Sequence, residues 1–230
     1  TDKLGDFMLT WPALADARAA LPDARIDVLV SPAVEEIAHA CPSIDRVIVD
    51  AGGSRRELRH QLRTGNYNAA VVLFSTARVA LALRAERIPY RLAPATKLHQ
   101  LFFNHRLRQR RSHSLKPEYE YNQDLIRQLL LDHDIPAPET TPKPPFWVLS
   151  PDDSSQPISA NSDRLVIIHP GSGGSARNLT LNQYANLANQ LKSDRPLFVL
   201  ITAGPGEAEQ ANLLVQSITG HQVGVYVSTH

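Results

Sequence analysis

The sequence has almost no cysteine, no long hydrophobic run and almost no net charge. Cys41 is the one cysteine among 230 residues, which excludes an internal disulfide and a zinc cluster built from cysteines. No apolar stretch approaches the roughly 18 residues that a membrane-spanning helix needs, and no signal peptide is recognisable. Because the chain opens on Thr1 in a turn-like stretch, we expect that an N-terminal piece is missing. The net charge of +1 argues against binding of polyanions by the protein as a whole.

Strand-like apolar runs alternate with amphipathic helical stretches in the first half of the chain. The pattern predicts strands at 25–32, 45–53 and 69–75, and helices at 10–21, 34–41, 55–66, 77–88 and 118–133. Gly65 is expected to end the helix at 55–66. Near-continuous apolar strands that alternate with helices are typical of an α/β fold with a parallel sheet.

A proline-rich segment separates two such patterns. Residues 135–161 contain seven of the 17 prolines, which indicates a connector, with one short strand expected at 146–149. The pattern then resumes with strands at 164–168 and 196–204, helices at 180–192 and 206–218, and a third strand from 223. We therefore predict domains at 1–135 and 163–230 joined by a connector at 136–162. The second domain is expected to be incomplete, since nothing follows its third strand.

The stretch HPGSGGSARN (169–178) joins an expected strand to an expected helix. Small residues there leave backbone amides accessible at a helix N-terminus, which favours an anion such as a phosphate. Three kinds of group favour anion binding: the glycines, two hydroxyls and one guanidinium, which belong to Gly171, Gly173, Gly174, Ser172, Ser175 and Arg177. The loop matches neither the dinucleotide fingerprint nor the Walker loop. A flexible connection is the alternative, and from the residues alone the two remain open.

Two acidic residues also have two interpretations each. Asp6, in TDKLGDF (1–7), is either the N-cap of a helix, which the residues alone favour, or a general base for an incoming hydroxyl. Glu207, in AGPGEAEQAN (203–212), either complements a helix dipole or accepts hydrogen bonds from ribose hydroxyls. For Glu207 alone, the helix-dipole interpretation is preferred.

The segment HRLRQRRSHSLK (105–116) concentrates positive charge. Its cations are Arg106, Arg108, Arg110, Arg111 and Lys116. Together with Phe102 and Phe103 they suggest an amphipathic basic patch for an anionic membrane surface or a phosphorylated acceptor. A solvated face is the ordinary alternative, and the overall neutrality of the chain counts against nucleic acid.

Five segments in order resemble the heptosyltransferases of glycosyltransferase family 9. They are TDKLGDFMLTWPAL, ACPSIDRVIVD, NYNAAVVLFSTARVALALRAERIPYRLAP, HPGSGGSARN and TAGPGE. The resemblance implies the GT-B architecture, in which two Rossmann-like domains with parallel sheets face a cleft. It implies transfer of a heptose from ADP-heptose to a lipopolysaccharide inner-core or lipid-linked acceptor, with inversion and with neither metal nor cofactor. It also implies a cytoplasmic protein and leaves room for peripheral contact with the inner membrane.

The resemblance also implies roles for individual residues. Asp6 is the catalytic base that deprotonates the acceptor. The donor-binding residues are Lys3 near the phosphates, Gly171, Ser172, Gly173 and Ser175 in the diphosphate loop, Arg177 where the family usually has a lysine, and Glu207 near the ribose. Asn178 to Thr180 depart from the family's usual Trp-Pro, and its later Asp-x-Gly…His segment has no counterpart before His230. These departures leave a non-catalytic or degenerate sugar-nucleotide-binding homologue as the alternative.

Overall fold

The structure is a computed structural model that describes residues 3–96, 98–139, 164–172 and 177–228. The chain divides into two compact units, residues 1–149 and 150–230. Most of the connector expected at 136–162 lies outside the described residues, and so does the short strand expected at 146–149. The expected domain boundaries therefore stay predictions.

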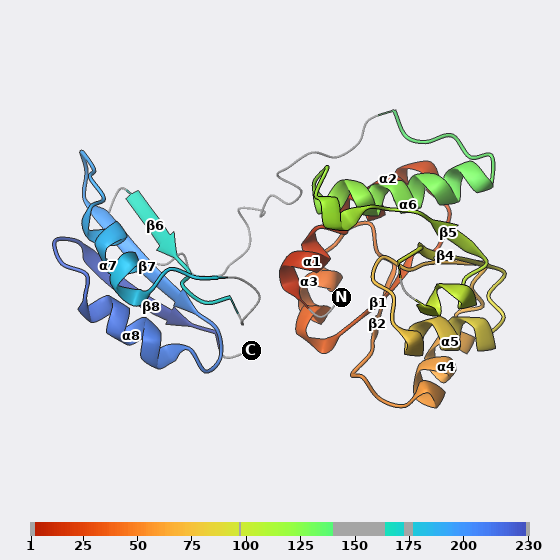
Figure 1. Ribbon diagram of the computed structural model, residues 1–230, viewed down its shortest axis with the longest axis horizontal. Coiled ribbons are helices and arrows are strands. Elements are labelled where there is room, and N and C mark those ends of the chain that lie inside the picture. Colours follow the sequence, from red (N-terminus) through yellow and green to blue (C-terminus); the bar gives the residue numbers. More distant parts are fainter. Residues whose placement is uncertain (1–2, 97, 140–163, 173–176, 229–230) are drawn as a thin grey trace. The chain divides into compact units, whose positions relative to one another are not determined.

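The first unit alternates strands with helices, as the hydrophobic pattern predicts (Figure 1). Its elements are α1 (Leu4–Met8), α2 (Trp11–Ala20), β1 (Asp27–Val30), η1 (Pro32–Val34), α3 (Glu35–His39), β2 (Arg46–Val49), α4 (Arg55–Arg63), β3 (Ala69–Val71), α5 (Ala77–Ala85), β4 (Tyr90–Pro94), η2 (Leu98–Phe102), β5 (His105–Leu107), η3 (Arg111–His113) and α6 (Glu118–Asp132). The strands pair in parallel as β1–β2 and as β3–β4–β5. Parallel neighbours need crossover connections, and α3, α5 and η2 provide them.

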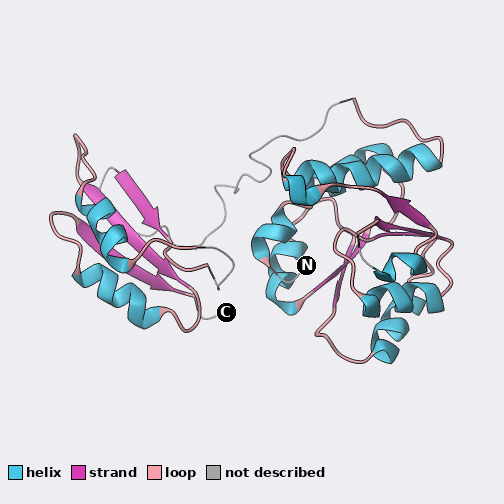
Figure 2. Cartoon of the chain, viewed as in Figure 1, coloured by secondary structure: helices cyan, strands magenta, loops and turns pink. Residues whose placement is uncertain are grey.

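Helices cover both faces of the three-stranded sheet in this unit (Figure 2). Successive side chains of a strand point to opposite faces. Leu92 of β4 belongs to the core cluster that contains Leu125 and Leu129 of α6, and α6 in turn packs beside α2. The next residue, Ala93, belongs to the cluster formed with α4 and α5. Two covered faces explain why β4 is apolar along almost its whole length.

The ends of α4 show how local sequence sets the boundaries of a helix. Ser54 caps the helix, since its Oγ accepts from Glu57 N at 3.2 Å while the Glu57 carboxylate accepts from Ser54 N at 2.7 Å. The helix ends at Arg63 with Thr64 as its C-cap, so Gly65 follows the helix end as the sequence predicts, although Asn66 is the residue with positive φ, at 48°. Gly65 has a further role: the ring of Tyr67 occupies the position that a Cβ at residue 65 would need.

The second unit has one parallel sheet in the order β6–β7–β8. Its elements are β6 (Arg164–Ile168), α7 (Leu181–Asn189), β7 (Leu197–Ala203), α8 (Ala208–Gln216) and β8 (Gln222–Val227). Val199 and Ile201 of β7 share a core cluster with residues of α7 and α8, so both helices cover the same face. On the opposite face Ile167 and Tyr226 are exposed, and no helix among the described residues covers them.

Candidate functional site

The carboxyl ends of β6 and β7 carry the two glycine-containing loops that the sequence indicates. In open parallel α/β sheets, ligands bind outside this edge. The strands are paired in register up to Ile168 and Ile201, so the loops that follow them leave the sheet side by side. His169, at the start of the first loop, is linked to Thr202 of β7 by a hydrogen bond of 2.9 Å between Nδ1 and Oγ1. Sequence reasoning did not select His169, because its partner lies 33 residues away.

Glu207 joins the two loops. It is the N-cap residue of α8 but makes no side-chain capping hydrogen bond, and its carboxylate accepts from Gly204 N at 3.0 Å, in the loop that precedes the helix. The same carboxylate also lies where a Cβ at Gly171 would be. Gly171 is therefore needed for close approach, since any larger residue would displace the Glu207 side chain. Both oxygens of Glu207 consequently lie at the mouth of the first loop.

The remaining donor-site expectations in this loop are only partly described. Ser172 is half-buried, and Arg177 is exposed just before the helix α7. Gly173, Gly174 and Ser175 lie outside the described residues. Thr180 begins α7 with a capping box, in which its Oγ1 accepts from Gln183 N at 3.3 Å and Gln183 Oε1 accepts from Thr180 N at 2.9 Å. The structure therefore brings Gly171 and Ser172 together with Glu207, and leaves the guanidinium of Arg177 in solvent.

Asp6 and Lys3 belong to the first unit. The interpretation of Asp6 as an N-cap is wrong: α1 begins at Leu4, Lys3 is its N-cap residue, and Asp6 lies inside the first turn. Both Lys3 and Asp6 are exposed, whereas the next residue, Phe7, is buried in a core cluster. An exposed carboxylate held on a helix that Phe7 anchors is accessible to an incoming hydroxyl, as a general base must be.

The basic segment at 105–116 does not form the single amphipathic patch that its sequence suggests. Phe103 is 3% exposed and packs in the core with Phe102, because η2 turns both rings toward α5. Arg111 forms an ion pair with Glu118 and donates from Nε to Gln109 Oε1 at 2.9 Å. Lys116 forms an ion pair with Asp124. These two cations are paired with carboxylates of α6 and hold the segment against that helix, and the expectation that they bind an acceptor or a membrane stays a prediction.

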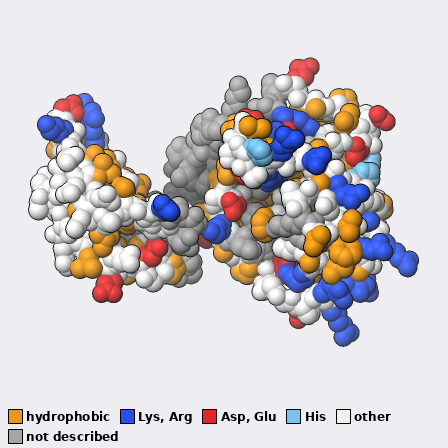
Figure 3. Space-filling view, in the orientation of Figure 1, with side chains coloured by type: hydrophobic (Ala, Val, Ile, Leu, Met, Phe, Trp, Pro, Cys, Tyr) orange, Lys and Arg blue, Asp and Glu red, His pale blue; other side chains and the backbone are white. Residues whose placement is uncertain are grey.

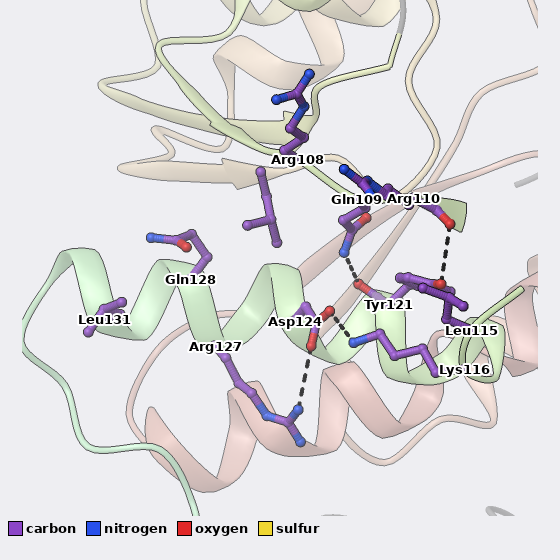
Figure 4. A pocket seen from close by; sticks show the side chains of 11 residues that line it. Arg108, Gln109, Arg110, Leu115, Lys116, Tyr121, Asp124, Arg127, Gln128 and Leu131 are labelled. Atoms are coloured by element: carbon purple, nitrogen blue, oxygen red, sulfur yellow. Dashed lines mark hydrogen bonds and ion pairs between the residues drawn. The ribbon is translucent and has the colours of Figure 1, made fainter. Parts of the chain in front are cut away.

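A cavity of about 570 Å³ lies between this segment and α6 (Figure 4). Its floor is Tyr121, whose carbonyl accepts from Gln109 Nε2 at 2.6 Å, and its only described carboxylate is Asp124. Asp124 is shared by Lys116 and by Arg127, whose Nη1 lies 3.6 Å from Asp124 Oδ1. The polar groups in this cavity thus mainly satisfy one another. Figure 4 shows the Arg108 side chain directed away from α6 and from these pairs.

Two further properties bear on chemistry. Within the described ranges, no cluster of three or more histidine, cysteine, aspartate or glutamate residues is arranged to bind a metal ion. Of the helices in those ranges, none is both long enough and apolar enough to cross a bilayer.

Comparisons with known proteins identify the family. No protein-family model matches the chain. A Haemophilus influenzae protein named "Putative glycosyltransferase" is 39% identical over 238 residues, which cover 98% of this chain and 68% of the relative. Among solved structures, E. coli ADP-heptose lps heptosyltransferase II has a TM-score of 0.76 at 22% identity, over 95% of this chain and 67% of that one.

Two more structures agree with this fold. A glycosyl transferase family 9 protein of Veillonella parvula has a TM-score of 0.76 at 16% identity, with 99% of this chain and 68% of that one covered. E. coli heptosyltransferase WaaC with ADP has a TM-score of 0.70 at 19% identity, with 100% and 73% covered. These likenesses show the α/β GT-B fold, and the curated relative shows the activity class. The chain therefore belongs to the glycosyltransferases, and its fold is the one seen in the family 9 protein and the heptosyltransferases.

Proposed function

We propose that the protein transfers a heptose from ADP-heptose to a lipopolysaccharide inner-core acceptor, with inversion at the anomeric carbon. The observation that carries the donor assignment is the position of Glu207, whose carboxylate lies against Gly171 at the carboxyl edge of β6 and β7. One of its oxygens accepts from Gly204 N, and the other has no hydrogen bond to a described residue. That second oxygen is suited to accept a hydrogen bond from a ribose hydroxyl.

The same edge suits a diphosphate. Gly171 has no side chain of its own beside the Glu207 carboxylate, Ser172 adds a hydroxyl, and the N-terminus of α7 and Arg177 add positive charge. Lys3 would add a further cation near the donor phosphates. The solved WaaC structure with ADP supports an adenine nucleotide as the donor's leaving group. Gly173 and Ser175 complete the proposed diphosphate loop.

Asp6 is the proposed general base. Its carboxylate takes the proton of the acceptor hydroxyl as the acceptor oxygen bonds to the anomeric carbon of the donor. The bond from that carbon to the β-phosphate oxygen breaks, and its electron pair leaves with ADP. Cationic side chains and backbone amides stabilise the negative charge that develops on the diphosphate. The proposal places the reaction in the cytoplasm, with peripheral contact at the inner membrane.

The first test is nucleotide selectivity. Isothermal calorimetry with ADP, UDP and GDP should show binding of ADP in clear preference to the other two. Binding of none of them would contradict the donor site. Binding of ADP-heptose without any transfer would favour the alternative, a non-catalytic homologue.

The second test is Asp6→Asn. Removal of a general base should lower the rate of heptose transfer by about 10²–10⁴-fold, while ADP affinity stays the same. Asp23→Asn, which also changes an exposed carboxylate of the first unit, is the matched control and should leave the rate unchanged. A transfer rate for Asp6→Asn close to that of the wild type would refute the assignment.

A further inference from the structure

The crossover η2 presents two leucines to solvent. It connects β4 to β5 and packs against α5. A 3₁₀ turn has three residues per turn, so Leu98 and Leu101 lie on one ridge of η2. Their side chains are 90% and 73% exposed, although Phe103, just after η2, is 3% exposed. The connection therefore buries its phenylalanine and exposes an adjacent pair of leucines.

Arginines lie on the same side of the sheet as this ridge. Arg106 of β5 is the register partner of Ala93, which faces the core formed with α4 and α5. Arg108, just after β5, is among the residues that line the cavity beside α6, but its side chain points away from α6 in Figure 4. Both arginines are exposed, and neither has a side-chain hydrogen bond or ion pair within the described part of the chain.

A third arginine stands at the other end of the ridge. Arg91 donates from Nε to the carbonyl of Phe102, the last residue of η2, at 3.2 Å. Arg84 is an exposed residue of α5, the helix against which η2 packs. The carboxylate of Glu86 forms ion pairs with Arg59 and Arg63, so it does not neutralise the charge of Arg84.

These residues form what we name the leucine–arginine surface: Leu98, Leu101, Arg84, Arg106 and Arg108. In Figure 3, exposed hydrophobic side chains gather over the part of the first unit where Figure 1 draws η2 and α5, and Lys and Arg side chains border them. We propose that this surface docks the protein on an anionic lipid bilayer, with both leucines inserted between headgroups and the arginines against lipid phosphates.

The positive charge of the leucine–arginine surface favours an anionic bilayer over a second copy of the chain as its partner. A two-fold dimer through this surface would bring the same arginines of both copies face to face, which is unfavourable. An anionic bilayer provides the complementary charge, and the combination of an apolar insertion with several cations is what reversible membrane binding requires. The inference rests on the proposed function and deepens it, because an enzyme whose acceptor is anchored in a membrane needs a surface that contacts that membrane. Vesicle binding itself needs neither donor nor transfer.

The test is flotation of the full chain with vesicles of phosphatidylglycerol and phosphatidylethanolamine, compared with phosphatidylcholine alone. Wild type should float with the anionic vesicles only, and less so at high salt. Leu98→Ser/Leu101→Ser should weaken binding about tenfold or more. Arg106→Gln/Arg108→Gln should weaken it about 25-fold, at about fivefold for each arginine. The matched control is Leu115→Ser/Leu131→Ser, which changes leucines that are 76% and 69% exposed elsewhere and should bind like wild type.

A second measurement reports insertion directly. Cys41 is buried, so a polarity-sensitive fluorophore on Leu101→Cys would label that position selectively. Its emission should shift to the blue with anionic vesicles, and the same label on Leu131→Cys should not shift. The proposal would be overturned if the control Leu115→Ser/Leu131→Ser lost vesicle binding as much as Leu98→Ser/Leu101→Ser. It would also be overturned if the emission of the label at residue 101 did not shift, or if the wild type were a dimer that Leu98→Ser/Leu101→Ser dissociates. Calorimetry with ADP on the same variants separates the membrane-docking proposal from the proposed transferase function. A variant that loses vesicle binding but keeps its ADP affinity is impaired in membrane docking alone.

Discussion

The parallel sheets of the two units differ in how their faces are covered. In the first unit, Leu92 and Ala93 of β4 are both fully buried although they face opposite ways, because α6 covers one face and α4 and α5 cover the other. In the second unit, Ile201 is 0% exposed beneath α7 and α8, whereas Ile167 of β6 is 58% exposed on the opposite face. Leu200 of the central strand β7 is only 3% exposed on that same opposite face, so burial here depends both on what covers a face and on whether the strand lies at the edge of the sheet.

The units also differ in where charge is used. Nine of the ten ion pairs among the described residues lie in the first unit, and the second has one, Arg164 with Asp194 at 3.0 Å. The proposed donor site of the second unit relies instead on bare backbone, hydroxyls, one carboxylate and the exposed charge of Arg177 at its rim. Its function should therefore be sensitive to loop geometry, while the stability of the first unit should be sensitive to pH.

The largest effect is expected from the comparison of Ile201→Ala with Ile167→Ala. Loss of a fully buried isoleucine side chain leaves a cavity, so Ile201→Ala should lower the free energy of unfolding by about 2–5 kcal/mol. Ile167→Ala removes a half-exposed side chain and should cost less than about 1 kcal/mol. Urea denaturation followed by circular dichroism measures both. An equal cost at the two positions would show that the exposed face of this sheet is covered in solution.

The sequence predicted the helices and strands of both units better than it predicted which faces of them are buried. Hydrophobic periodicity located β3, β7 and most of the helices, because the core selects apolar residues at the spacing of each element. It did not locate β4 or β5, which lie in the stretch 90–116 where arginines and histidines interrupt the apolar pattern. It could not tell Ile167 from Ile201, since both lie in apolar runs and differ only in what packs on them. The helix end before Gly65 was predicted, but the sequence did not show that this glycine also makes room for the ring of Tyr67.

The site was predictable where it depended on local sequence. The glycine loop, and the place of Glu207 at the start of a helix, follow from small residues between a strand and a helix. The pairing of Lys116 with Asp124 and of Arg111 with Glu118 was not read from the run of cations, because it requires the way that segment folds onto α6. The contact of Glu207 with Gly171 joins loops that are 36 residues apart in the sequence, so only the register of β6 with β7 reveals it.

Gly171→Ala tests whether the second unit depends on loop geometry. A Cβ at residue 171 would displace the Glu207 carboxylate, so ADP affinity should fall about tenfold, or about 1.4 kcal/mol. Calorimetry with ADP provides the measurement. Gly204→Ala is the matched control, because its Cβ would lie at an ordinary 3.4 Å from Glu207 Oε2 and its N–H would still donate. The same loss in both variants would point to stiffening of the loops, and no loss in Gly171→Ala would remove Glu207 from the donor site.

The smallest effect is expected from Glu86→Gln, which tests the charge-dependent stability of the first unit. Glu86 accepts from Arg59 Nε at 2.6 Å and from Arg63 Nε at 3.1 Å. The hydrogen bonds from Arg63 and then from Arg59 lower the pKa of the Glu86 carboxyl. Because Arg63 is largely in solvent, the substitution should lower the free energy of unfolding at pH 7 by no more than about 1 kcal/mol.

The sign of the pH dependence follows from the lowered pKa. The unfolded chain protonates Glu86 near its ordinary value of 4.5, whereas the folded chain holds the charge to lower pH. The stabilisation is therefore complete well above pH 4.5 and is lost as the pH falls through the folded-state pKa. Urea denaturation from pH 7 downward should show the difference between wild type and Glu86→Gln shrinking in that window. Glu139→Gln, at an exposed carboxylate with no ion pair to a described residue, should follow the wild type at every pH. A difference for Glu86→Gln that persists unchanged at low pH would mean that Glu86 acts through packing and not through its charge.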